Sequence, residues 1–201
     1  MSTAVQVRRL VELGVPELAG VGAAEFTGYA DGLPEAADAL VVVHPSLVAP
    51  SRLAGRLCRD GKPGFVVVDL ADLDEFAPID GVPVPDRPLY FVYGVERGDE
   101  MGNWSPNEAL PAITGRGRSP LTVGEGISWL LQEPGRLERN RCFMTIGSRR
   151  GGDARTPAIW ISNGTGRDGR ANRGAPKVGW CWAGNRHTWL GFASASGRSP
   201  A

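Results

Sequence analysis

The sequence has few cysteines, few histidines and no long apolar run. Its three cysteines, Cys58, Cys142 and Cys181, form no CxxC pair, so we expect no metal site. The longest uninterrupted apolar run is Ala39–Val43, far below the ~18 residues that span a bilayer. Because residues 1–13 also lack the apolar core of a secretory signal, we predict a cytoplasmic protein with no membrane partner.

A net charge is also absent, since 22 basic and 22 acidic side chains cancel. The balance hides a split along the chain. Residues 1–138, the acidic portion, hold 11 Lys+Arg and 20 Asp+Glu, whereas residues 139–201, the basic portion, hold 11 Lys+Arg and two Asp. Four of the six tryptophans lie in the basic portion. No flexible linker separates the two portions, and we therefore expect one compact domain.

The acidic portion alternates patterns typical of strands and helices. Apolar runs predict buried strands at 39–43, 64–69 and 89–95, with a helix over 51–59 between the first two. This order resembles a βαβ unit and predicts a small, partly parallel sheet. The four prolines of the stretch 72–88 argue against regular structure there.

Helix starts in the acidic portion are marked by capping chemistry. Two capping boxes, Ser105–Glu108 and Thr122–Glu125, each predict the first turn of a helix. A further helix is predicted over 4–13 and ends at Gly14.

The basic portion is predicted to consist of short antiparallel strands. These strands are expected at 142–146, 158–162, 178–182 and 188–193, with the last two forming a hairpin around 183–187. Residues 195–201 are expected to be a frayed tail. The predicted fold class is therefore α+β, an N-terminal α/β portion continued by a C-terminal antiparallel β portion.

A glycine- and arginine-rich loop, residues 163–177, is the first candidate site. It contains GxGxxG at Gly164, Gly166 and Gly169, but Gly174 and Pro176 exclude the helix that a dinucleotide fingerprint requires. No P-loop sequence is present either, so we predict no cofactor. Glycine backbone N–H groups and basic side chains can instead hold an anion. The predicted ligand-binding residues of the loop are Gly164, Gly166, Arg167, Arg170, Arg173 and Lys177. Two alternatives remain open: an inert solvated loop, and docking of the basic portion onto the acidic one.

The predicted tryptophan-rich hairpin is the second candidate. Strand alternation places Trp180 and Trp182 on one face and Cys181 on the other. Exposed indoles beside basic groups suit stacking on bases or sugars, and we add Trp182, Asn185 and Arg186 to the binding residues. The alternative is that these tryptophans fill a core.

Two enzymatic alternatives follow from the histidines. Cys181, His187 and Asp168 could form a nucleophile, a base and its orienting carboxylate. If the strands of the acidic portion are parallel, His44 and Asp69 share a sheet edge and could do acid–base work. Binding of an anionic small molecule remains the main hypothesis, and a nucleic-acid or protein interaction module is the third class.

Five motifs suggest a family. They are Arg97–Asp99, Asn103–Pro106, Cys142–Arg149, Ile159–Ser162 and Gly179–Trp189. Together they resemble an uncharacterised actinobacterial family that carries only a domain-of-unknown-function label. The resemblance covers most of the chain and is best in its final hundred residues. It implies a bacterial, cytosolic protein and implies no activity.

Overall fold

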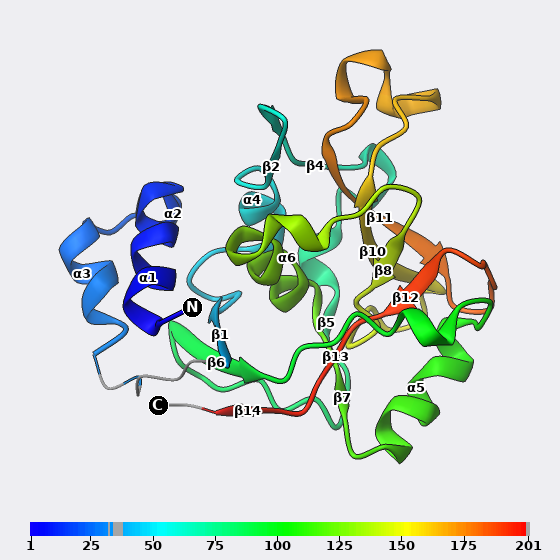
Figure 1. The fold of residues 1–201 in the computed structure, drawn as a ribbon, viewed down its shortest axis with the longest axis horizontal. Helices are drawn as coiled ribbons and strands as arrows, with labels where there is room; N and C mark the ends of the chain where they lie inside the picture. The colour runs from blue at the N-terminus through cyan, green and yellow to red at the C-terminus, as the bar shows by residue number, and fades with distance from the viewer. Residues whose placement is uncertain (32, 34–37, 200–201) are drawn as a thin grey trace.

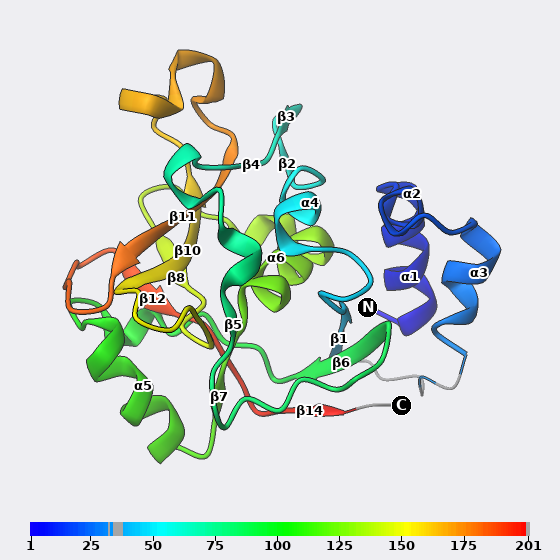
Figure 2. The same ribbon diagram turned by 180° about the vertical axis from the view of Figure 1, so that it is seen from behind.

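The computed structural model describes residues 1–31, 33 and 38–199. The fold is α+β, as predicted, and its helices and sheets are drawn in Figure 1 and, from behind, in Figure 2. In the described ranges the α-helices are α1 (Thr3–Glu12), α2 (Val15–Ala19), α3 (Ala23–Gly28), α4 (Pro50–Ala54), α5 (Pro106–Gly115) and α6 (Val123–Gln132). Short 3-10 turns are η1 (Val68–Leu70), η2 (Leu73–Glu75), η3 (Asp99–Met101), η4 (Pro134–Arg136), η5 (Gly166–Asp168) and η6 (Arg170–Asn172).

Both predicted capping boxes are formed. The Ser105 and Thr122 hydroxyls accept from the backbone N–H groups of Glu108 and Glu125, and each glutamate accepts from its cap residue in return. The helix predicted over 4–13 is confirmed as α1, whose last turn leads to Gly14 in the left-handed region. Local capping chemistry therefore predicts these helix starts correctly.

The first sheet orders its strands as β1 (Ala39–Val43), β6 (Leu89–Tyr93) and β14 (Gly197–Ser199), all antiparallel. The predicted parallel βαβ unit is therefore wrong. The connection over 44–88 does not cross back over this sheet; it contributes α4 and β4 (Phe65–Val66) to the rest of the molecule. Residues 72–88, predicted to be irregular, contain η2 and β5 (Ala77–Pro78), which pairs with β9 (Ser148–Arg149).

The second sheet orders its strands as β12 (Leu190–Phe192), β8 (Cys142–Met144), β10 (Arg155–Ile161), β11 (Pro176–Trp182) and β4. The sheet is mixed, because β12 runs parallel to β8 and β4 runs parallel to β11. The predicted hairpin of 178–182 with 188–193 is wrong, since β8 and β10 lie between those strands. The hairpin that does form joins β10 to β11 through residues 162–175, with Ile161 opposite Pro176.

The C-terminal segment is ordered through residue 199, so the frayed tail predicted over 195–201 is wrong for that part; residues 200–201 lie outside the described residues. β13 (Ser194–Ala195) pairs with β7 (Ser119–Pro120), and β14 pairs with β6. The remaining short pair is β2 (Cys58–Arg59) with β3 (Lys62–Pro63). Each of the two larger sheets thus combines strands from before and after residue 138.

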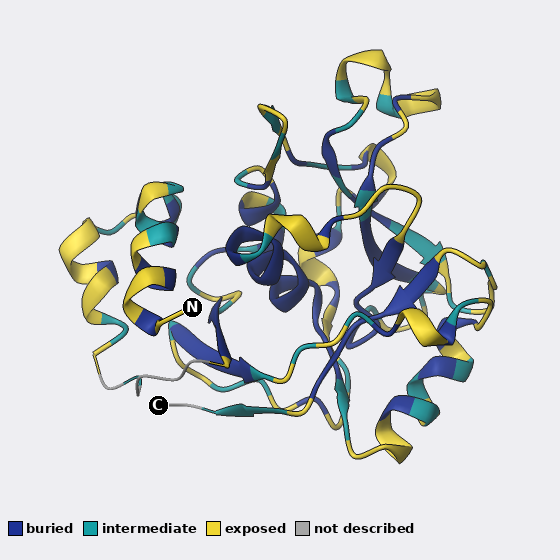
Figure 3. Ribbon diagram, viewed as in Figure 1, coloured by how far each residue is buried: buried dark blue, intermediate teal, exposed yellow. Residues whose placement is uncertain are grey.

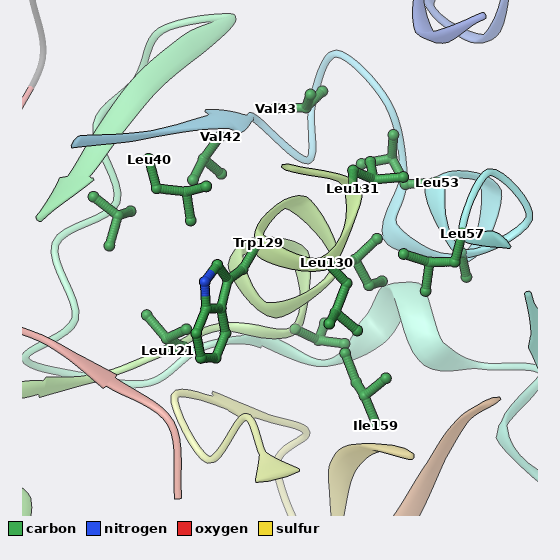
Figure 4. Packing of buried hydrophobic residues seen from close by; sticks show 14 of the residues in the cluster. Leu40, Val42, Val43, Leu53, Leu57, Leu121, Trp129, Leu130, Leu131 and Ile159 are labelled. Carbon is green, nitrogen blue, oxygen red and sulfur yellow. The ribbon is translucent and has the colours of Figure 1, made fainter. Parts of the chain in front are cut away.

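The core is centred on α6, every residue of which is buried (Figure 3). In Figure 4 its Trp129, Leu130 and Leu131 lie among side chains from β1, α4 and β10. Gly126 permits this close packing, because a Cβ there would come within 2.5 Å of the Thr145 Cγ2. The helix therefore connects the two sheets through one apolar cluster.

Candidate functional site

Many basic side chains of the basic portion form ion pairs with acidic side chains of the acidic portion. Five arginines of the basic portion form ion pairs with carboxylates of the acidic portion. These pairs are Arg141–Asp99, Arg150–Asp72, Arg155–Asp72, Arg186–Glu108 and Arg198–Glu125. Docking of the basic portion onto the acidic one, an alternative raised by the sequence, thus accounts for these cations.

A second group of arginines has no such partner. The guanidinium groups of Arg139, Arg149, Arg167, Arg170 and Arg173 make no hydrogen bond or ion pair within the described ranges. Three of the five line one hollow of about 680 Å³. The basic hollow, as we name it, is lined by Arg59, Asp60, Lys62, Arg139, Asn140, Ile161, Ser162, Asn163, Gly164, Thr165, Arg170, Arg173 and Gly174. Five cationic side chains therefore face one carboxylate.

The basic hollow lies between the β2–β3 turn and the loop joining β10 to β11. Figures 1 and 2 show both segments at the same end of the molecule, and Figure 3 shows most of the loop exposed. The parallel pairing of β4 with β11, Phe65 opposite Lys177, positions the β2–β3 turn there. With Arg139, three separate parts of the sequence thus supply the charge.

Hydrogen bonds from the Lys62 side chain to backbone carbonyl groups of the loop fix these two segments to each other. The Lys62 Nζ donates to the carbonyl oxygens of Ala171, at 3.3 Å, and Arg173, at 2.6 Å. Gly164 lies at φ +69°, and a Cβ there would overlap the Cβ of Arg173. A glycine is therefore needed at 164 for the loop to fold back and present Arg173.

A second, smaller hollow adjoins the first. It measures about 370 Å³ and is lined by Asn140, Arg141, Trp160, Ile161, Asn163 and Trp189. We name it the aromatic hollow. Asn140, Ile161 and Asn163 belong to both hollows, so the two share a wall.

Three loop residues predicted to bind a ligand lie outside the basic hollow's lining. Gly166 and Arg167 are exposed in the loop. Lys177 instead donates to the Asp168 carboxylate at 2.8 Å and lies 4.7 Å from the centroid of the Trp160 ring. The same carboxylate accepts from the Ser162 hydroxyl. Asp168 and Lys177 therefore fasten the base of the loop.

The structure does not assemble the Cys181, His187 and Asp168 triad. No hydrogen bond or ion pair joins any two of them in the described part of the chain. Cys181 packs against a second apolar cluster, and burial raises the pKa of its thiol, which opposes thiolate formation. The His187 ring instead lies 5.4 Å from that of Trp189.

The His44 and Asp69 pair lacks the sheet edge on which it was based. β1 and β6 are antiparallel, and Asp69 lies in η1. The His44 Nδ1 is 2.6 Å from the Ser46 hydroxyl, and burial lowers the pKa of the imidazole. The Asp69 backbone carbonyl accepts from Arg155.

The tryptophans of β11 lie at the other end of that strand. Trp180 and Trp182 share a face, as predicted, with ring centroids 4.5 Å apart, and Asn185 follows in the next loop. Arg186 lines a separate open hollow of about 600 Å³ with Trp104 and Glu108. The structure therefore separates Trp182, Asn185 and Arg186 from the basic hollow.

The Glu108 carboxylate supports a pH-dependent prediction. Hydrogen bonds from Ser105 and the Arg186 guanidinium lower its pKa from 4.5 to about 2. A carboxylate with a lowered folded-state pKa stabilises above its unfolded-state value and loses that contribution as the pH falls. We expect the stability difference between wild type and Glu108→Gln, measured by urea unfolding, to be full near pH 6 and to shrink between about pH 4.5 and pH 2. A difference that stays constant over that range would contradict the assignment.

Comparison with known proteins gives one result. A protein-family model, described as a family of unknown function (DUF5701), matches residues 9–201. The chain belongs to this family. No curated protein and no solved structure matches the chain significantly. Across the ranges that the structure describes, every helix is too short or too polar to cross a bilayer.

In this member of DUF5701, sequence reasoning missed part of the basic hollow. Arg59 and Lys62 flank a glycine turn, and Arg139 and Asn140 are the first two residues of the basic portion. The only local feature that marks Arg59 and Lys62 in the sequence is that they are two basic residues at a turn, a pattern common on solvated surfaces. Only the β4–β11 pairing brings that turn beside the loop.

Proposed function

We propose that the chain binds a phosphorylated small molecule, of the nucleotide or sugar-phosphate class, in the basic hollow. The observation that carries the proposal is the lining of five cationic side chains and one carboxylate around about 680 Å³. Such a volume falls within the ~300–1,000 Å³ typical of small-molecule sites.

The lack of ion-pair partners for three of the lining arginines, among the residues that the structure describes, favours ligand binding over docking of the basic portion onto the acidic one. The guanidinium groups of Arg139, Arg170 and Arg173 have no partner in the described ranges, whereas Arg59 is paired with Asp60 at 2.6 Å. A guanidinium presents a planar fork that grips phosphate with two hydrogen bonds. Three such forks around one hollow can neutralise a phosphate dianion.

A polymer is the less favoured anion. Five of the other arginines in the basic portion are already paired with acidic side chains, which reduces the number of cations left to contact a phosphate backbone. A nucleic-acid surface depends on many phosphate contacts. The bacterial cytosol implied by the family resemblance is a compartment in which small phosphorylated metabolites occur.

The test compares arginines of one loop. Isothermal titration with AMP, ribose 5-phosphate and pyrophosphate would be run on wild type, Arg170→Ala, Arg173→Ala and Arg167→Ala. A hydrogen bond to a charged group contributes ~1.5–3 kcal/mol, so Arg170→Ala and Arg173→Ala should each weaken binding roughly ten- to hundredfold. Arg167→Ala removes the same charge from the same loop outside the hollow and should change affinity less than about twofold.

Two results would overturn the proposal. If none of the three probes binds wild type, the hollow is not a phosphate site. If Arg167→Ala weakens binding as much as Arg170→Ala, the effect is a general field and not a site. The melting temperatures of all variants should match wild type, because these guanidinium groups make no hydrogen bond or ion pair with a described residue.

A further inference from the structure

The aromatic hollow, next to the basic hollow, offers aromatic side chains to which a phosphate group does not bind. It shares Asn140, Ile161 and Asn163 with the basic hollow and is lined by Trp160 and Trp189. We infer that the ligand is a nucleotide whose phosphate lies in the basic hollow and whose base lies in the aromatic hollow. This inference rests on the proposed function.

Trp160 is held in a fixed position by its strand neighbours. Gly179 on β11 has no side chain beneath the Trp160 ring, and a Cβ there would come within 2.5 Å of the ring. The Lys177 ammonium, directly across the strand pair, lies 4.7 Å from the ring centroid. The indole is thus oriented before any ligand arrives, which lowers the entropy lost on binding.

Trp189 supplies an exposed aromatic surface. The residue is 41% exposed although its backbone is held in place, since its carbonyl oxygen accepts from the N–H of Cys142 at 2.9 Å. The His187 ring lies 5.4 Å away. A large apolar ring left exposed on an ordered backbone, beside a hollow, is an arrangement suited to stacking a base.

The shared wall offers hydrogen-bonding groups to a base edge. The amides of Asn140 and Asn163 make no side-chain hydrogen bond within the described ranges. An amide carries both donors and an acceptor and can pair in two places with a base edge. Asn140 also has φ +56°, a left-handed conformation that asparagine tolerates better than most residues.

The charges around the aromatic hollow argue against a second phosphate there. Its one cation, Arg141, is paired with Asp99 at 3.0 Å and with Glu138 at 3.5 Å. A bisphosphate would leave the two tryptophans without a partner. A neutral, flat and polar-edged group beside the phosphate matches both hollows.

The experiment separates the base from the phosphate. AMP, GMP, CMP, UMP and ribose 5-phosphate would be titrated into wild type, Trp189→Ala, Trp189→Phe and Trp182→Ala. Base stacking is worth ~1–3 kcal/mol, so at least one nucleotide should bind wild type about tenfold or more tightly than ribose 5-phosphate. Trp189→Ala should remove that advantage and leave the ribose 5-phosphate affinity within about twofold.

The remaining variants act as controls. Trp189→Phe keeps an aromatic face and should retain most of the advantage. Trp182→Ala removes another tryptophan, which is 46% exposed and lies outside both hollows. This variant should leave the affinities for the nucleotides and for ribose 5-phosphate unchanged. Circular dichroism of each variant checks that the fold is unchanged.

The possible outcomes point to different errors. Equal affinity for ribose 5-phosphate and all four nucleotides would overturn the inference and leave the proposed function standing. Binding by none of the five probes would overturn both. Much tighter, steeply salt-dependent binding of a single-stranded oligonucleotide would replace both with a nucleic-acid surface.

Discussion

Arg198→Met is expected to lower the free energy of unfolding by about 3–5 kcal/mol, the cost of leaving a buried charge unpaired. The Arg198 side chain is 2% exposed and its Nε lies 2.5 Å from the Oε1 of Glu125, which is fully buried. The guanidinium also donates to the Ser119 hydroxyl and the Pro120 carbonyl oxygen. One side chain near the C-terminus therefore ties β14 to β7 and to the first turn of α6.

The same network explains why the loss should be large. The Glu125 carboxylate accepts from the Tyr90 hydroxyl at 3.1 Å and from the N–H of Thr122 at 2.7 Å. Removing Arg198 leaves this fully buried carboxylate with neutral donors only. Truncation of one partner of a buried pair costs far more than the pair itself contributes.

Two variants test the explanation by urea unfolding. Arg186→Met breaks the exposed pair with Glu108 and should lower the unfolding free energy much less than Arg198→Met does. The double variant Arg198→Met with Glu125→Gln removes both charges and keeps a capping residue, so it should recover a large part of the loss. A change below about 1 kcal/mol for Arg198→Met alone would contradict the buried-charge account.

The local parts of the fold could be predicted from the sequence, whereas the strand partners could not. Capping at Ser105 and Thr122 depends on residues within one turn, and the apolar run Ala39–Val43 marks a buried strand wherever it pairs. Whether that strand runs parallel or antiparallel to Leu89–Tyr93 depends on the path of 45 intervening residues, 44–88. No local pattern encodes that path.

The candidate site shows the same division. Arg170 and Arg173 were predicted from the loop's own glycine and arginine content. Arg59 and Lys62 reach the hollow only because β4 joins β11, a pairing between residues more than 100 positions apart in the sequence. Arg198 lay in a segment predicted to fray, because its buried partner Glu125 is 73 positions away.

Gly98→Ala is the second substitution with a large expected effect. Gly98 lies at φ +73°, and a Cβ there would overlap the carbonyl oxygen of Phe192 on β12. The left-handed conformation costs a residue with a Cβ ~1–2 kcal/mol, and overpacking adds ~1–3 kcal/mol. The expected loss of unfolding free energy is therefore about 2–5 kcal/mol.

A matched glycine separates the two causes. Gly152 has nearly the same φ, +74°, but a Cβ there would meet nothing within 4 Å. Gly152→Ala should therefore show the conformational cost alone, about 1–2 kcal/mol. Equal losses in the two variants, measured by urea unfolding, would show that the approach of Phe192 contributes nothing. A larger loss for Gly98→Ala would give the Arg97–Asp99 motif a structural role. In that motif Arg97 donates to the Arg136 carbonyl oxygen and to the Asp99 carboxylate. Gly98 allows the same turn to lie directly against β12.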